Sequence, residues 1–272
     1  MPARRNPRLA LNLTDADKLS RCFMTGRDAY DFRAQRLYVA DDLAEGATVA
    51  LTREQANYLI NVLRLGDGAI VHVFNGRDGE WRARVVKRGR RDAALDVRQQ
   101  TRAQIGGPDL HYLFAPLKRT RLDYLVQKAT EMGSARLQPV ITQHTVAERV
   151  NLDRMRANVI EAAEQCGILR VPDVAEPTPL KRALEAWDAG RTLVFCDEEA
   201  PVQDPIEALR KVKPGPLAVL IGPEGGFSEE ERALLCRHPH IVRLALGPRI
   251  MRADTAAVAA LALVNAVLGD WR

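Results

Sequence analysis

The pattern of hydrophobic and polar residues along the chain changes once, near Pro108. Before Pro108, short β-prone runs are separated by tight turns, which is typical of a small β-barrel. After Pro108, apolar runs of strand length alternate with amphipathic segments of helical period. Such alternation predicts an α/β domain with a mainly parallel sheet and helices on both faces. We therefore expect two domains of different class.

The first part has one expected helix among its strands. Thr52 and Gln55 have the spacing of a capping box, so the helix begins there. An Asn75-Gly76 turn separates two of the strands, and residues 99–107 are expected to form a linker. Strands are expected at residues 37–39, 48–51, 70–74, 80–86 and 93–97.

The second part begins with a strand at residues 110–114. Gly133 and Gly167 are expected to end two of its helices, and a second capping box, Ser228 with Glu231, predicts where a third helix begins. Further strands are expected at residues 137–141, 193–196, 217–221 and 241–246, and helices at 121–132, 152–166, 180–187, after Ser228 and at 255–268. We place the domain boundaries at residues 1–34 for a loose N-terminal extension, 35–106 for the barrel and 107–272 for the α/β domain.

The 272 residues are 46% hydrophobic, enough for a sizeable core. No apolar run reaches the roughly 18 residues of a membrane span, so no membrane partner is expected. The four cysteines are scattered and have no metal-ligand spacing, which argues against a metal site and suits a cytoplasmic protein. Met24 is a second plausible start, so residues 1–23 can be an upstream segment that the native protein lacks.

The net charge of +5 arises entirely within the first 105 residues. One stretch there is basic without any interleaved acid, which suits contact with a phosphate backbone. A solvated strand face and turn would give the same pattern. The stretch contains Arg82, Arg84, Lys87, Arg88, Arg90 and Arg91.

Two glycine loops follow two of the apolar strands. The first is Leu-Ile-Gly-Pro-Glu-Gly-Gly-Phe-Ser at residues 220–228, and the second is Leu-Gly-Pro-Arg-Ile-Met-Arg-Ala-Asp-Thr-Ala at residues 246–256. In parallel sheets, ligands bind beyond the carboxyl ends of the strands, where both loops lie. The loops lack the phosphate-binding patterns, and the acids around Glu224 would repel phosphates. A neutral or cationic adenosine ligand fits better, although a purely structural turn remains an alternative.

The second loop carries two arginines. Arg249 and Arg252 flank Ile250 and Met251, which could wall an adenine pocket while the arginines face an anionic substrate. Alternatively, both arginines pair with Glu224 or Asp254, or cap nearby carbonyl groups.

These two segments together resemble the RsmE family, the 16S ribosomal RNA uridine-N3 methyltransferases of the SPOUT class. The similarity extends upstream in order along the chain and covers roughly residues 35–272. It includes the segments at residues 36–39, 62–65, 126–133 and 164–167.

The resemblance implies a fold, a cofactor and partners. The expected fold is an α/β SPOUT domain with a deep trefoil knot, preceded by a PUA-like barrel that helps to bind RNA. The expected activity is methyl transfer from S-adenosylmethionine to uridine N3 in 16S rRNA of the small ribosomal subunit, by a homodimer. Two other functions remain open: methylation of another RNA position, and a non-catalytic ribosome-assembly factor.

The resemblance also implies site residues. Arg249, Arg252 and Asp254 are the predicted catalytic residues, and no general base is identified, with Glu224 and Asp254 as candidates. A third cofactor loop is expected around Asp197 and Glu198. The predicted cofactor-binding residues are Ile221, Gly222, Glu224, Gly225, Gly226, Leu246, Gly247, Ile250, Met251, Thr255 and Ala256. The predicted RNA-binding residues are Arg36, Arg64, Arg82, Arg84 and Lys118.

The chain departs from the family pattern in the second loop. Met251, Ala253 and Asp254 stand where the family commonly has Leu, Thr and Glu. Met251 conserves volume. Asp254 keeps the charge with a shorter reach and is expected to cap the last helix. His144 is expected to be an ordinary surface residue.

Overall fold

The computed structural model describes residues 34–147, 149–201 and 204–271. The chain from Gln35 onwards forms one compact unit. The predicted N-terminal extension, apart from Ala34, and the second start at Met24 lie outside the described residues. Among the described residues, no helix is long and apolar enough to cross a membrane.

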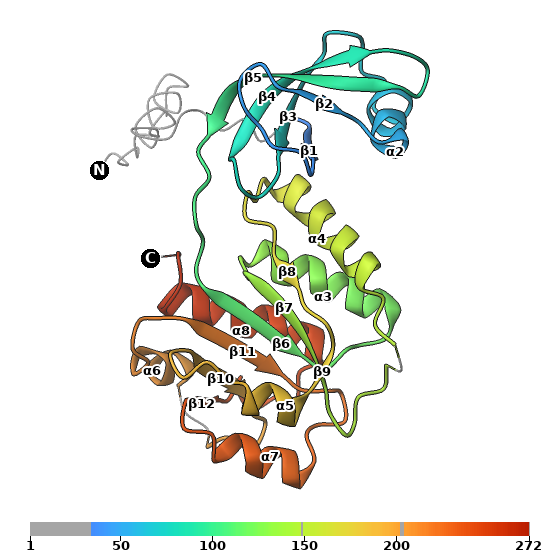
Figure 1. The fold of residues 1–272 in the computed structure, drawn as a ribbon. Helices are drawn as coiled ribbons and strands as arrows, with labels where there is room; N and C mark the ends of the chain where they lie inside the picture. Colours follow the sequence, from blue (N-terminus) through green and yellow to red (C-terminus); the bar gives the residue numbers. More distant parts are fainter. Residues whose placement is uncertain (1–33, 148, 202–203, 272) are drawn as a thin grey trace, which may run out of the picture. The chain divides into compact units, whose positions relative to one another are not determined.

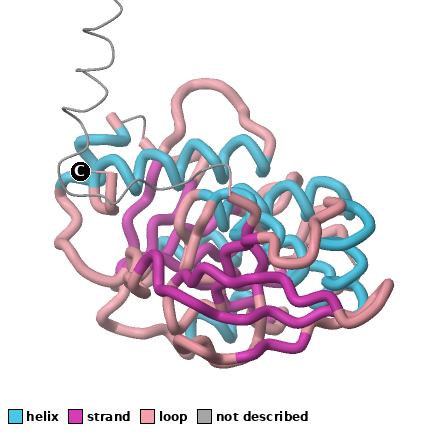
Figure 2. The backbone as a smooth tube through the Cα atoms, turned by 90° about the horizontal axis from the view of Figure 1, so that it is seen from above, coloured by secondary structure: helices cyan, strands magenta, loops and turns pink. Residues whose placement is uncertain are grey.

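The first part of the chain forms a five-stranded sheet in the order β1-β3-β4-β5-β2. It is an open half-barrel because β1 and β2 are its edges, and β1 joins β3 in parallel while the other neighbours are antiparallel. Its long strands run side by side (Figure 2). The strands are β1 (Arg36–Tyr38), β2 (Thr48–Ala50), β3 (Ile70–Phe74), β4 (Glu80–Lys87) and β5 (Ala93–Arg102).

The expected helix of the half-barrel begins at the predicted capping box. Thr52 accepts from the backbone N–H of Gln55, and the Gln55 side chain accepts from that of Thr52. The α-helix α2 (Arg53–Asn57) is short, however, and continues as a π-helical turn, η1 (Tyr58–Val62). Both pack their apolar side chains into the core of the half-barrel.

The prediction that residues 99–107 form a linker is wrong for the first four of them. Strand β5 continues to Arg102, and Gln99, Gln100 and Arg102 pair with residues of β4. These residues are polar because they lie on the less buried end of the sheet, so their composition resembles that of a loop. The remaining residues, 103–107, connect β5 to β6.

The second part is a seven-stranded sheet in the order β12-β10-β11-β6-β7-β8, with β9 paired to β7, and each of these pairs is parallel (Figure 1). Its strands are β6 (Leu110–Phe114), β7 (Arg136–Ile141), β8 (Asp173–Val174), β9 (Thr178–Pro179), β10 (Thr192–Cys196), β11 (Leu217–Ile221) and β12 (Ile241–Leu244). Its helices are α3 (Arg119–Glu131), α4 (Leu152–Cys166), α5 (Leu180–Glu185), α6 (Pro205–Arg210), α7 (Glu229–Cys236) and α8 (Ala253–Val267).

Both faces of this sheet are buried, as expected for parallel strands. One core contains Val219 and Ile221 of β11 with apolar residues of α3, α4, α6 and α8. The other contains the intervening Leu220 with residues of α5 and α7. The two-residue period of a strand therefore divides its side chains between two helical layers.

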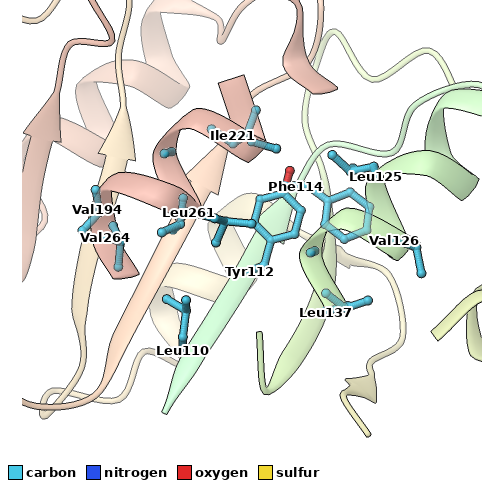
Figure 3. Close-up of a cluster of buried hydrophobic side chains, with 14 of the residues drawn as sticks. Leu110, Tyr112, Phe114, Leu125, Val126, Leu137, Val194, Ile221, Leu261 and Val264 are labelled. Carbon is cyan, nitrogen blue, oxygen red and sulfur yellow. The ribbon is translucent and has the colours of Figure 1, made fainter. Parts of the chain in front are cut away.

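The larger core is centred on two aromatic residues of β6. Tyr112 and Phe114 stack with ring centroids 5.1 Å apart and are almost fully buried. Figure 3 shows them between Leu261 of α8 and Leu125 of α3. This packing seats both helices on the central strands and so holds the ends of β11 and β12 near α8.

The expected strands and helices are present, with small differences at their ends. Helix α8 begins at Ala253 rather than Thr255, and β12 ends at Leu244 rather than residue 246. Strands β8 and β9, of two residues each, and helix α6, of six residues, were not predicted. The trefoil knot and the domain boundaries stay predictions.

Candidate functional site

Three loops meet where adjacent parallel strands end. Strand β10 lies between β11 and β12, so the segments after Cys196, Ile221 and Leu244 emerge at the same edge of the sheet. They enclose a cavity of about 610 Å³. Its lining includes residues of all three loops and of the starts of α7 and α8, among them Asp197, Glu198, Gly222, Glu224, Gly226, Phe227, Arg232, Gly247, Arg249, Ile250, Met251, Arg252 and Ala256.

The first glycine loop needs its glycines for two different reasons. A Cβ on Gly222 would lie 2.5 Å from the ring of Phe227, so no larger residue fits without moving that ring. Phe227 is itself held by an edge-to-face contact with Phe195, at 5.2 Å between centroids. Gly226 has a φ of +71°, which favours glycine, and a Cβ there would lie 3.2 Å from Glu198. The backbone can therefore line the cavity closely.

The loop after β10 is held by a buried carboxylate. Asp197 is 4% exposed and accepts hydrogen bonds from Arg232 of α7 and from Arg243 of β12, at 3.2 and 2.7 Å. Burial alone would raise the pKa of Asp197, but these hydrogen bonds outweigh it and hold the pKa below its usual range. Asp197 therefore stays ionised and ties the three loops together. Its neighbour Cys196 is inert as a nucleophile because burial raises the pKa of its thiol to about 12.

Glu224 of the first loop pairs with a residue that the sequence did not suggest. Its carboxylate accepts a hydrogen bond from Arg121 of α3. The alternative that Glu224 pairs with Arg249 or Arg252 is therefore wrong. Among the described residues, neither of these two arginines forms an ion pair, and both guanidinium groups are exposed on the lining of the cavity.

The second glycine loop turns sharply into α8. Gly247 has a φ of +92°, in the region that favours glycine. Arg252 is the N-cap residue of α8, so the expectation that Asp254 caps this helix is wrong. Asp254 lies within the first turn of the helix, where its carboxylate accepts from the backbone N–H of Thr255 and complements the helix dipole. Ile250 is 95% exposed despite its position on the lining.

The structure brings most of the predicted cofactor residues together. Nine of them line the cavity, together with Arg249, Arg252 and the predicted third-loop residues Asp197 and Glu198. The nine are Ile221, Gly222, Glu224, Gly226, Leu246, Gly247, Ile250, Met251 and Ala256. Gly225, Asp254 and Thr255 lie outside the lining. Gly225 faces the His144 side chain, which also hydrogen bonds to the carbonyl of Gly226 at 3.0 Å.

Sequence reasoning missed Phe227 and Arg232 on the lining. Phe227 directly follows the last glycine of the loop, and Arg232 lies in the first turns of α7, four residues after the Ser228 cap. Both residues lie close to the predicted helix start at Ser228. The first turn of a helix packs against the loop that precedes it, so this closeness could have indicated that both residues line the cavity. Ser228 and Glu231 form the predicted capping box.

The cavity is electrostatically suited to a cation on one side. Of the four acidic residues on its lining, Asp197, Glu199 and Glu224 pair with arginines, whereas Glu198 forms no ion pair among the described residues. Arg249 and Arg252 lie on the second loop. A positively charged ligand group is favoured beside Glu198, and an anionic one beside the two arginines. Among the described residues, no group of three or more acidic, His or Cys side chains could hold a metal ion.

The predicted RNA-binding residues separate into two groups. Arg64, Arg82, Arg84 and Lys118 are exposed. Arg36, by contrast, is 3% exposed, and its Nε lies 3.0 Å from Oε2 of buried Glu80. The prediction that Arg36 contacts RNA is therefore wrong, because its charge neutralises a carboxylate inside the half-barrel.

The buried pair belongs to a small ionic cluster. Burial would raise the pKa of Glu80, but hydrogen bonds from His72 and Thr101, with the charges of His72 and Arg36, lower it to about 2. The cluster joins β1, β3, β4 and β5, so it is part of the framework of the half-barrel.

Comparison with family models identifies both parts. A model described as an RNA methyltransferase domain matches residues 106–265, and one described as an RNA methyltransferase PUA domain matches residues 51–97. The first match alone covers more than half of the chain.

Curated relatives and solved structures agree with the models. The chain is 31% identical to the ribosomal RNA small subunit methyltransferase E of Synechocystis, over 86% of this chain and 78% of the relative. It is 28% identical to the protein of the same name from Rickettsia conorii, over 85% and 94%. The crystal structure of ribosomal RNA small subunit methyltransferase E from Neisseria gonorrhoeae bound to S-adenosyl methionine superposes with a TM-score of 0.79 at 25% identity, covering 88% of this chain and all of that one.

The fold explains why these matches extend over both parts of the chain. The half-barrel precedes a parallel sheet whose three adjacent loops form the cavity. The chain thus belongs to the RsmE family of ribosomal RNA small subunit methyltransferases, in which a PUA-like domain precedes a SPOUT-class RNA methyltransferase domain.

Proposed function

We propose that this protein transfers a methyl group from S-adenosylmethionine to N3 of a specific uridine in 16S rRNA. The observation that carries the proposal is the cavity formed by the three loops, with carboxylates on its lining and two arginines that have no ion-pair partner among the described residues. The names of the relatives support the ribosomal RNA substrate.

The residues of the cavity fit S-adenosylmethionine. A volume of about 610 Å³ lies in the range of roughly 300–1,000 Å³ that is usual for small-molecule sites. Gly222 and Gly226 leave backbone free to approach the ligand, at positions where a Cβ would meet Phe227 or Glu198. Glu198, which forms no ion pair within the described part of the chain, offers negative charge to the cationic groups of the cofactor. The bound cofactor supplies a methyl group activated by attachment to a sulfonium.

The protein residues then have two tasks. The loops align the uridine with the methyl group, which can contribute several kcal/mol to lowering the barrier. Arg249 and Arg252 stabilise the negative charge that develops on the uracil as N3 loses its proton to solvent water. Arg121 neutralises Glu224, and Asp254 lies outside the cavity lining. We therefore assign neither carboxylate the role of general base.

The RNA must present its uridine outside a base-paired stack, because only an unstacked base can enter such a cavity. In this proposal Arg64, Arg82, Arg84 and Lys118 contact the RNA backbone from exposed positions. The partner is 16S rRNA, within the small ribosomal subunit.

The substitution Arg252→Ala tests the catalytic assignment. We expect it to abolish N3 methylation while S-adenosylmethionine affinity, measured by calorimetry, stays within a few-fold. Activity is measured by nucleoside mass spectrometry of 16S rRNA from a deletion strain carrying each variant. Arg237→Ala, which removes another exposed arginine of the same domain, is the control and should methylate normally. Full activity in Arg252→Ala would overturn the assignment.

Two results would redirect the proposal. Methylation at another nucleotide would keep the chemistry and change the target. Absence of S-adenosylmethionine binding to the wild-type protein would favour a non-catalytic assembly factor.

The proposal includes a homodimer. Ile250 supports it, since its aliphatic side chain is 95% exposed on a cavity loop and is available to be buried at an interface. Light scattering after size-exclusion chromatography should give twice the mass of 30.2 kDa. A monomer at micromolar concentration would contradict this part.

A further inference from the structure

One segment of the RsmE-like sequence, Glu164-Gln165-Cys166-Gly167, lies far along α4 and does not line the cavity. It ends helix α4, with Gly167 in the left-handed conformation at φ +63°. The end of α4 instead faces β1 of the half-barrel. The segment therefore contacts the RNA-binding part of the chain.

The most specific of these contacts is made by Glu164. Its Oε1 accepts a hydrogen bond from the backbone N–H of Tyr38 at 2.8 Å. Tyr38 is the last residue of the edge strand β1. At this end of the strand, the backbone N–H of the next residue, Val39, donates the hydrogen bond to β3. The Tyr38 carbonyl accepts from the Gln55 side chain at 2.9 Å. Glu164 thus accepts a hydrogen bond from the Tyr38 N–H, which has no partner within the sheet.

Other contacts surround this hydrogen bond. Arg102 of β5 donates to the carbonyl of Gly167 at 2.8 Å. Ala163 and Leu169 pack against buried Phe74 of β3 in a separate apolar cluster. The end of α4 is therefore fixed to three strands of the half-barrel by backbone, side-chain and apolar contacts.

The charge of Glu164 makes this contact unusual. Burial raises the pKa of its carboxyl, the Tyr38 N–H opposes this effect, and Glu161 adds to the rise. A half-buried carboxylate with an acidic neighbour is not the most stable choice for a helix end. The Tyr38 N–H compensates the carboxylate only while the half-barrel is in place.

The other end of α4 is tied toward the cavity. Arg154 and Asn158 hydrogen bond to Asp123 of α3, at distances of 2.6 to 2.8 Å. Two residues before Asp123, Arg121 holds Glu224 in the first glycine loop. Helices α4 and α3 therefore form a continuous packed connection between the half-barrel and the cavity.

We infer that Glu164 is a positioning residue, which fixes the half-barrel on α4 so that bound RNA lies in register with the methyl group in the cavity. This inference rests on the proposed function. It concerns how the RNA and the cofactor are placed relative to each other, and Glu164 itself contacts neither of them. Loss of the Tyr38 hydrogen bond should therefore lower the rate of transfer without weakening either binding event.

The test compares three substitutions of Glu164. Glu164→Ala removes the acceptor, Glu164→Asp keeps the charge but shortens the reach, and Glu164→Gln keeps an acceptor without the charge. Glu161→Ala, one turn earlier on the same helix, is the matched control. We expect kcat to fall about tenfold in the Ala and Asp variants and to stay within twofold of wild type in the Gln and control variants.

Binding and local structure are measured on the same proteins. Affinity for S-adenosylmethionine and for the RNA should stay within twofold in all variants. Amide hydrogen exchange at Tyr38 should accelerate in the Ala and Asp variants only. A merely structural role would instead weaken cofactor binding together with kcat, or leave the Asp variant equal to wild type.

Three results would overturn the inference: unchanged kcat in Glu164→Ala, a Gln variant as slow as the Ala variant, or unchanged exchange at Tyr38. Should Glu164→Ala fail to fold, the Asp variant decides. Failure of the proposed function is distinguishable, because then wild-type protein also lacks N3 methylation while hydrogen exchange still reports the contact.

Discussion

At the scale of single residues, the arginines of this protein differ in whether they pair with a carboxylate. Arg36 and Arg121 are both committed to a carboxylate, Glu80 and Glu224 respectively, whereas Arg249 and Arg252 remain available on the cavity lining. An arginine without a partner beside a cavity is suited to an anionic substrate, and a buried, paired arginine is not. Ion pairing in the folded protein therefore distinguishes structural arginines from available ones, which the sequence alone cannot do.

Glu80 should make the stability of the half-barrel depend on pH. Its pKa falls from 4.5 to about 2 on folding, so its contribution is complete above pH 4.5 and is lost as pH falls toward 2. A shift of this size corresponds to about 3 kcal/mol. Glu80→Gln should lower the urea midpoint at pH 7 and flatten the pH dependence between 4.5 and 3.

The exposed Glu45 of the same half-barrel supplies the comparison. Glu45→Gln should leave both the midpoint at pH 7 and its pH dependence close to wild type. Equal effects of the two substitutions would show that the buried cluster does not stabilise the fold.

Gly222 provides a second prediction at this scale. An alanine Cβ would lie 2.5 Å from the ring of Phe227, which lines the cavity and must then move. We expect Gly222→Ala to weaken S-adenosylmethionine binding at least tenfold by calorimetry. Gly66→Ala, where a Cβ meets nothing within 4 Å, should bind normally. Normal binding by Gly222→Ala would mean that the ring has room elsewhere.

At the scale of elements, helix starts hold the loops of the cavity. Helix α7 begins at the capping box of Ser228 and Glu231, and the Glu231 carboxylate also accepts from the backbone N–H of Gln143, at 2.8 Å. One side chain therefore caps a helix and ties the loop after β7 to it. The capping box was predictable because its residues are three positions apart, but the contact with Gln143 was not.

Removing the cap should destabilise the methyltransferase domain. Ser228→Ala loses the acceptor for the Glu231 N–H and should cost about 1 kcal/mol in urea unfolding. Ser228→Thr keeps the acceptor and should retain most of the stability. Equal loss in both variants would show that the hydroxyl is not what stabilises the helix start.

At the scale of the whole molecule, separate cores support the PUA-like half-barrel and the methyltransferase domain. The small cluster around Phe74 and Leu169 adds apolar contact at the end of α4. The basic stretch predicted to bind RNA lies partly on β4, where Arg82 and Arg84 are exposed on the same face. If these arginines bind RNA as proposed, we expect that RNA affinity and methyl transfer can be altered separately.

The salt dependence of RNA binding tests this division. Removing Arg82 and Arg84 together should weaken RNA binding and reduce the slope of log affinity against log salt by about 1.4, since each phosphate contact to single-stranded RNA contributes about 0.7. Cofactor affinity should not change. Replacing the exposed Arg210 and Arg237 by Ala is the control with the same charge change. An unaltered slope would place the RNA elsewhere.

Most of the elements and both glycine loops could be predicted from the amino-acid sequence alone. Capping boxes, glycine stops and apolar periods act over a few residues, so Ser228, Gly167 and the five longer strands of the parallel sheet were predictable. The polar end of β5 was not, because its pairing with β4 compensates for residues that would otherwise form a loop. Tertiary structure alone decided which charges meet. Arg121 and Glu224 are 103 positions apart, and Tyr38 and Glu164 are 126 apart, so only the path of the folded chain brings them together.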